Sequence, residues 1–110
     1  MIVNLSKRVE DLDWERITYE VLNRGFSITE RILFDAACLQ LKGCYREDGL
    51  YRKTIVMQRH SMGRGEYKYF AYPLPSLVQE LRSAFYAQLQ PLANVWCERL
   101  GIAQRFPQDH

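Results

Sequence analysis

Residues 54–75 read TIVMQRHSMGRGEYKYFAYPLP, and this stretch decides the fold. It opens with a β-branched run, Thr54-Ile55-Val56-Met57, and continues with an aromatic segment from Tyr67 to Tyr72, a composition typical of strands. The glycine-containing segment 61–65 between them is long enough for a wide hairpin or for a lobe over a site. The two prolines at the end of the stretch cannot donate to a ladder, so they end the sheet. The stretch therefore predicts a β-hairpin.

Two helices and a short strand are expected before the hairpin. Apolar residues at three- and four-residue spacing predict a helix from Asp13 to Asn23, ending at Gly25. Residues Phe26–Thr29 alternate apolar and polar side chains, which favours a strand buried on one side. A second helix is expected from Phe34 to Lys42, with Gly43 past its end.

A long helix is expected after the hairpin. From Ser76, leucines and aromatic residues recur at helical intervals up to Gly101. Pro91 removes one backbone donor and crowds the preceding turn, so it should kink the helix or split it in two. A helix with one apolar stripe normally packs across a sheet. The order helix, strand, helix, β-hairpin, long helix predicts an α+β fold, and the length of 110 residues predicts a single domain over residues 1–110.

Composition and charge exclude several classes of protein. The net charge of +2 is too small to indicate a nucleic-acid or membrane partner. No apolar run approaches the ~20 residues that cross a bilayer. The pair Lys7-Arg8 interrupts the first apolar run before it could act as a secretory signal. The three cysteines are odd in number and lack the spacing of zinc or redox motifs, which favours buried thiols in the cytoplasm.

Recognisable catalytic motifs are missing from the sequence. A triad of His60, Asp109 and His110 could be written for a metal, but its ligand order and its place at a chain end are wrong for a rigid site, so no metal is expected within the chain. There is no nucleophile elbow and no phosphate loop. The segment Gly63-Arg64-Gly65 is better explained as a turn that needs positive φ.

One cluster on the hairpin could bind a ligand. Its members combine cationic and aromatic side chains: Arg59, His60, Arg64, Tyr67, Lys68 and Tyr69. Arginine and lysine bind carboxylate or phosphate, and tyrosine supplies hydroxyl donors and stacking faces. In a strand, Tyr67 and Tyr69 share one face while Lys68 and Phe70 share the other. An ordinary amphipathic hairpin with its basic side in water explains the same pattern equally well.

A nucleic acid is disfavoured as the ligand of this cluster. Three acidic residues, Glu47, Asp48 and Glu66, lie close to it in the sequence and dilute its positive charge. Electrostatic binding to phosphates depends on an excess of cationic side chains. An anionic or planar small ligand is therefore expected in preference to a nucleic acid.

The sequence RHSMGRGEYKYFAYPLPSLVQELRSAFYAQLQPLANVW, residues 59–96, carries a family resemblance. It contains an Arg-His pair, a GRGEYKYF-like segment, a PLP turn and a helix ending near an asparagine-tryptophan motif, here with Val95 between the two residues. Residues 57–110 resemble the N-terminal region of a bacterial group of Fe(II)- and 2-oxoglutarate-dependent oxygenases, of the prolyl-hydroxylase-like kind. The region before residue 57 is similar to the same family more loosely.

The resemblance implies a double-stranded β-helix whose iron is held by an HxD motif and a later histidine. The sequence contains no HxD motif, since His60 is followed by Ser61-Met62 and His110 is the last residue. The family pattern would place the metal-binding half after His110, so the chain is expected to be truncated and inactive alone. Fe(II) and 2-oxoglutarate are then implied for the full-length protein, and the six residues of the hairpin cluster would face substrate or cosubstrate.

Two functions follow from these expectations. The first is the N-terminal portion of a hydroxylase acting on an unidentified substrate. The alternative is a small non-catalytic α+β module that binds a partner protein. A portion without its β-helix should leave part of the apolar stripe from Leu77 to Leu100 uncovered. It would then associate with the missing catalytic half or with itself.

Overall fold

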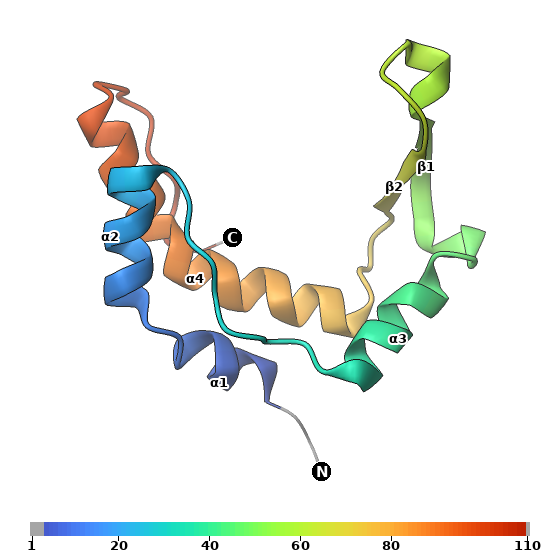
Figure 1. The fold of residues 1–110 in the computed structure, drawn as a ribbon, viewed down its shortest axis with the longest axis horizontal. Coiled ribbons are helices and arrows are strands. Elements are labelled where there is room, and N and C mark those ends of the chain that lie inside the picture. The colour runs from blue at the N-terminus through green and yellow to red at the C-terminus, as the bar shows by residue number, and fades with distance from the viewer. Residues whose placement is uncertain (1–3, 110) are drawn as a thin grey trace. The chain divides into compact units, whose positions relative to one another are not determined.

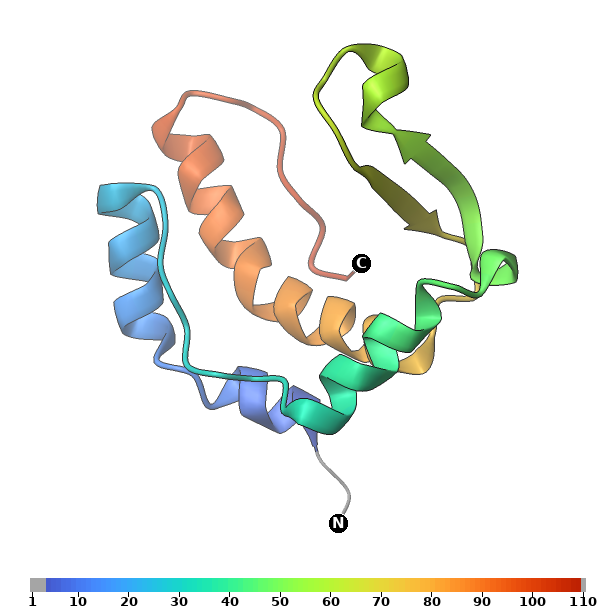
Figure 2. The same ribbon diagram turned by 45° about the vertical axis from the view of Figure 1, so that its right-hand side comes forward.

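The computed structural model describes residues 4–109, drawn in Figures 1 and 2. The chain divides into two compact units, each with its own internal packing. The helical unit comprises residues 1–33 and 79–110, and the hairpin unit comprises residues 34–78. Helices and one two-stranded antiparallel sheet make this an α+β protein, as the sequence predicts.

The helical unit begins with two short helices. Helix α1 spans Leu5–Glu10, and helix α2 spans Trp14–Arg24. The side chains of Asn4 and Asp13 cap them by accepting hydrogen bonds from backbone N–H groups of the first turns. Gly25 ends α2 with a left-handed φ of 86°. The prediction of α2 is confirmed. Helix α1 was not predicted, because six residues are too few to show a helical apolar period.

The core of the helical unit is made by apolar side chains of α1, α2 and α4. Its buried members are Leu5, Val9, Leu12, Ile17 and Leu92. The indole Nε1 of Trp14 donates to the Val9 carbonyl oxygen at 2.7 Å, and its ring meets Phe85 of α4 edge-on at 6.3 Å between centroids. The expectation that the long helix packs across a sheet is therefore wrong for this unit, because α1 and α2 supply the apolar partner surface.

The strand predicted at residues 26–29 is wrong. Residues 26–34 form neither helix nor strand. Side chains of the helices hold this segment instead: the Arg16 guanidinium donates to the Ile28 carbonyl oxygen at 3.3 Å, and that of Arg8 donates to the Ile32 carbonyl oxygen at 3.0 Å. The alternating pattern wrongly indicated a strand buried on one side, because its apolar side chains are not buried: Ile28 is 77% exposed.

The hairpin unit holds the remaining elements. In chain order they are helix α3 (Asp35–Cys44), the 3-10 turn η1 (Asp48–Leu50), strand β1 (Tyr51–Val56), the 3-10 turn η2 (Met57–His60) and strand β2 (Glu66–Phe70). The strands pair antiparallel, which confirms the hairpin, and α3 confirms the second helix although Gly43 lies inside it. Gly63 and Gly65 adopt φ of 95° and 106°, as expected for turn glycines.

Helix α4 spans Ser76–Arg99 and continues without a break through Pro91. Of the two outcomes expected at Pro91, a kink or a split, the split is wrong, because one missing donor leaves the neighbouring helical hydrogen bonds in place. Figures 1 and 2 show the helix changing direction along its length. None of the helices formed by residues 4–109 is long and apolar enough to cross a membrane. The sheet that these residues form has two strands. A double-stranded β-helix needs many more strands, so that part of the predicted fold stays a prediction.

The thin core of the helical unit generates a stability prediction. Val9 is fully buried on α1, whereas Val95 on α4 is 37% exposed. Replacing Val9 by alanine removes two buried methyl groups, so V9A should lower the free energy of unfolding by about 2 kcal/mol. The matched variant V95A should change it by less than about 0.5 kcal/mol. Urea denaturation followed by circular dichroism measures both values, and equal losses would contradict the assignment of the core.

Candidate functional site

The register of the hairpin sorts its side chains onto two faces. Tyr69 lies opposite Lys53 and Tyr67 lies opposite Ile55, and directly opposed residues share a face. These four residues form what we call the tyrosine face. The other side, which we call the lysine face, is formed by Tyr51, Thr54, Val56, Glu66, Lys68 and Phe70. The expectation that Tyr67 and Tyr69 lie on one side and Lys68 and Phe70 on the other is confirmed.

The ammonium group of Lys68 is enclosed by residues of its own unit. Its side chain is only 10% exposed. The Nζ atom donates to the Tyr45 carbonyl oxygen at 2.7 Å and lies 4.1 Å from the centroid of the Tyr45 ring and 5.1 Å from that of Tyr51. The Asp48 carboxylate lies 3.6 Å away. Such cation–π contacts are strongest when water is excluded, so Lys68 fastens the segment before β1 onto the hairpin.

Tyr45 completes this arrangement through its hydroxyl group, which donates to Oε1 of Glu66 at 2.7 Å. The hydrogen bond to Glu66, with smaller contributions from desolvation and from the charge of Glu66, raises the pKa of Tyr45 to about 12. Beside it, the Tyr51 ring stacks on Phe70 at 4.9 Å between centroids. Desolvation raises the pKa of Tyr51. Contacts within the unit thus engage Glu66, Lys68 and Phe70 of the lysine face.

The tyrosine face is open to solvent. Tyr67 and Tyr69 are 40% and 44% exposed, and their rings meet edge-to-face at 5.6 Å between centroids. The register is irregular between Tyr51 and Lys53, a bulge in β1, and the Arg52 guanidinium lies 5.6 Å from the Tyr69 ring centroid. Desolvation, with a smaller contribution from the neighbouring Tyr69, raises the pKa of the Tyr67 hydroxyl group.

The six residues of the predicted cluster occupy three different places. Tyr67 and Tyr69 lie together on the tyrosine face, and Lys68 lies on the lysine face. Arg59 and His60 belong to η2, and Arg64 lies in the loop that follows, which is closed where the Met57 N–H donates to the Gly65 carbonyl oxygen at 2.9 Å. The structure therefore does not bring all six to one surface. Their proposed role in binding substrate stays a prediction.

Two cationic residues at the tyrosine face, one on it and one beside it, were missed by reasoning from the sequence. Lys53 is opposite Tyr69 in the register, and Arg52 lies beside the Tyr69 ring. The two-residue period of strands, carried back from β2 into β1, could have placed Lys53. It could not have placed Arg52, because the bulge next to it leaves no clear mark in the sequence.

The residues that the structure describes do not fit an iron site. Across residues 4–109, no group of three His, Cys, Asp or Glu side chains lies close enough to hold a metal ion. A non-haem iron site takes two histidines and one carboxylate on one side of the metal. His60, at the end of the exposed 3-10 turn, has no such companions among these residues. No step of a reaction is therefore assigned to this part of the chain.

A second arrangement lies at the end of the helical unit, where the segment after α4 returns along the helix (Figure 2). The Asn94 side chain holds the backbone of Phe106 at both ends: its Oδ1 accepts from the Phe106 N–H at 2.7 Å and its Nδ2 donates to the Phe106 carbonyl oxygen at 3.1 Å. The Tyr86 hydroxyl donates to the Pro107 carbonyl oxygen at 2.5 Å. Asn94, singled out in the sequence with Trp96, therefore fastens the returning segment.

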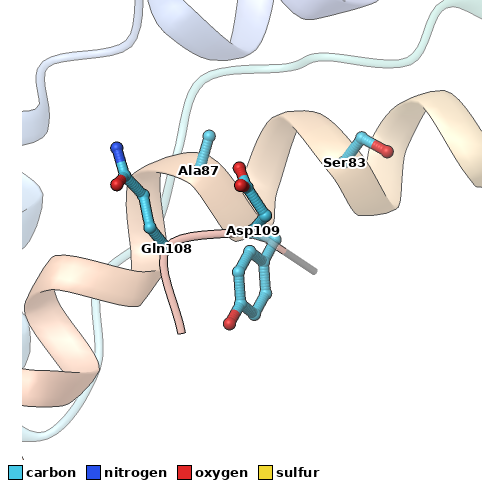
Figure 3. A pocket seen from close by; sticks show the side chains of 5 residues that line it. Ser83, Ala87, Gln108 and Asp109 are labelled. Atoms are coloured by element: carbon cyan, nitrogen blue, oxygen red, sulfur yellow. The ribbon is translucent and has the colours of Figure 1, made fainter. Parts of the chain in front are cut away.

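An open pocket of about 230 Å³ lies beside this returning segment. Figure 3 shows Ser83 and Ala87 on α4, and Gln108 and Asp109 on the segment that follows it. Among the described residues, its lining consists of the Asp109 carboxylate and the neutral side chains of Ser83, Tyr86, Ala87 and Gln108.

Comparison with known proteins gives one match. Residues 65–110 match the family model Oxygenase-NA, described as an oxygenase catalysing oxidative methylation of damaged DNA. The matched region starts just before β2 and includes Tyr67, Tyr69, α4 and the returning segment. The match supports an oxygenase family for this part of the chain. No curated protein and no solved structure matches the chain.

The contact between Tyr45 and Glu66 generates a pH prediction. Tyr45 should titrate near its pKa of about 12, and E66Q should bring that pKa down towards the ordinary value of about 10. Because the proton is held more tightly in the folded state, the stabilising effect of this contact is complete below pH ~10 and is lost as the pH rises through the folded pKa. The ¹³Cζ chemical shift of Tyr45 follows the titration.

The matched control is E47Q, since Glu47 is an acidic residue of the same segment and has no part in raising the pKa of Tyr45. This variant should leave the Tyr45 titration where it is in the unmodified chain. An equal downward shift in both variants would show that general charge, and not the hydrogen bond, sets the pKa.

Proposed function

We propose that this chain forms the N-terminal portion of an Fe(II)- and 2-oxoglutarate-dependent oxygenase. The observation that carries the proposal is the family match over residues 65–110, which begins within the GRGEYKYF segment of the sequence resemblance. Residues 4–109 supply no metal-binding group, so an enzyme of this kind would take its iron ligands from residues outside this range. Iron and 2-oxoglutarate would supply dioxygen activation there.

Exposed apolar side chains support the idea that further protein covers the helical unit. They lie on the second half of α4 and on the segment after it: Leu89, Val95, Trp96, Leu100, Ile102 and Phe106, each at least 37% exposed. Exposed large apolar side chains are typical of surfaces that another chain or domain covers when they form one patch. The proposed occupant is the catalytic half of the oxygenase.

The family description also gives a substrate class to test first. It names damaged DNA, whereas acidic residues near the hairpin cluster speak against a nucleic acid in the sequence. Two of those acids are engaged on the lysine face, Glu66 by the Tyr45 hydroxyl and Asp48 by Lys68. These contacts hold both carboxylates on the side of the sheet that carries Lys68.

Two measurements test the proposed function. The 110-residue chain, supplied with Fe(II), 2-oxoglutarate and ascorbate, should form no succinate above a protein-free control. The source DNA read past the codon for His110 should continue in frame to an HxD motif and a later histidine, and the longer protein should form succinate. Replacing the aspartate of that motif by alanine should abolish the activity. A stop codon directly after His110, or a longer frame without these ligands, would overturn the proposal.

A further inference from the structure

Positive charge is concentrated in the hairpin. Residues 51–70 contain five of the fifteen Lys and Arg residues but one of the thirteen Asp and Glu residues, a net charge of +4. The rest of the chain therefore carries −2, so the total of +2 conceals a basic hairpin on an acidic remainder. Such asymmetry attracts a polyanion to one part of a molecule.

The acidic groups near the hairpin lie away from the tyrosine face. Glu66 is on the lysine face, where its carboxylate accepts from the Tyr45 hydroxyl. Asp48 lies beside Lys68 on the same side. The charged residue of the tyrosine face is the cation Lys53, and the Arg52 guanidinium lies beside the Tyr69 ring of this face. The tyrosine face therefore joins uncompensated positive charge to exposed aromatic rings.

The geometry of the two tyrosines suits stacking on nucleobases. Tyr67 and Tyr69 are two residues apart on one strand, and their rings meet edge-to-face. An edge-to-face pair does not cover both ring faces, so at least one ring can receive a planar group from solvent. Sheets that bind single strands use aromatic side chains in this way, with neighbouring cations on the phosphates. In a duplex, neighbouring base pairs cover the faces of each base.

We propose that the tyrosine face, together with Arg52, binds single-stranded nucleic acid by stacking bases on Tyr67 and Tyr69 and pairing phosphates with Arg52 and Lys53. Lys68 takes no part in binding, because its ammonium group is enclosed by Tyr45 and Tyr51. This inference deepens the proposed function, on which its biological role rests, since it assigns a binding surface for the substrate class that the family description names, DNA. The binding itself needs neither iron nor 2-oxoglutarate, so each proposal can fail without the other.

Fluorescence anisotropy with the full 110-residue chain tests the proposal. The probe is a fluorescein-labelled oligo(dT) of about ten nucleotides, within the span of known single-strand sites. Binding should be tighter than to a duplex of the same length and tighter than to an abasic strand that has the phosphates but lacks the bases. Y67A and Y69A should each weaken binding roughly tenfold. R52A should weaken it a few-fold and lower the slope against salt concentration by about one.

Matched controls separate stacking from general effects. Y19A removes a tyrosine that is 68% exposed on α2, and R24A removes an arginine whose guanidinium lies 4.6 Å from the Phe26 ring centroid. Neither should change the affinity. Y67F and Y69F keep the rings and should keep the binding, which guards against a variant that loses binding through unfolding. Undetectable binding, equal affinity for the abasic strand or the duplex, or unchanged binding by Y67A and Y69A would overturn the proposal.

Discussion

The alternation of side chains along β2 is the constraint on which the hairpin unit depends. A strand sends successive residues to opposite faces, so Lys68 must lie on the side away from Tyr67 and Tyr69. The Lys68 ammonium then meets the Tyr45 and Tyr51 rings and the Tyr45 carbonyl oxygen, and holds the segment before β1 against the sheet. A one-residue slip of the pairing would exchange the two faces and remove these contacts. The same constraint leaves the Tyr67 and Tyr69 side chains exposed to solvent.

This division explains why charge counted along the sequence was misleading. Glu66 follows Gly65 and precedes Tyr67, so it seems close to every cation of the cluster. In space it belongs to the lysine face, where its carboxylate accepts a hydrogen bond from the Tyr45 hydroxyl group. Lys53 on the tyrosine face and Arg52 next to it in β1 are separated from this carboxylate, because Glu66 of β2 lies on the lysine face. Local electrostatics therefore favour an anionic ligand more strongly than the overall charge of +2 indicates.

Much of the fold could be predicted from the sequence because local signals agreed with it. Gly25 ended α2, the glycines at 63 and 65 marked the hairpin turn, and the prolines after Tyr72 ended the sheet. The failures came from tertiary context. Alternation at residues 26–29 does not form a strand, since Arg8 and Arg16 hold that segment in place of a partner strand. In the candidate site, alternation placed the tyrosines, but only the structure showed that Tyr45, far along the chain, encloses Lys68.

The central claim is that the tyrosine face meets a ligand while the lysine face serves the fold. Nuclear magnetic resonance of the tyrosine rings during titration with oligo(dT) tests it most directly, because one sample reports on the tyrosines of both faces. The account predicts that ring signals of Tyr67 and Tyr69 shift while those of Tyr45 and Tyr51 stay in place. Equal shifts of all four rings, or shifts confined to Tyr45 and Tyr51, would contradict it.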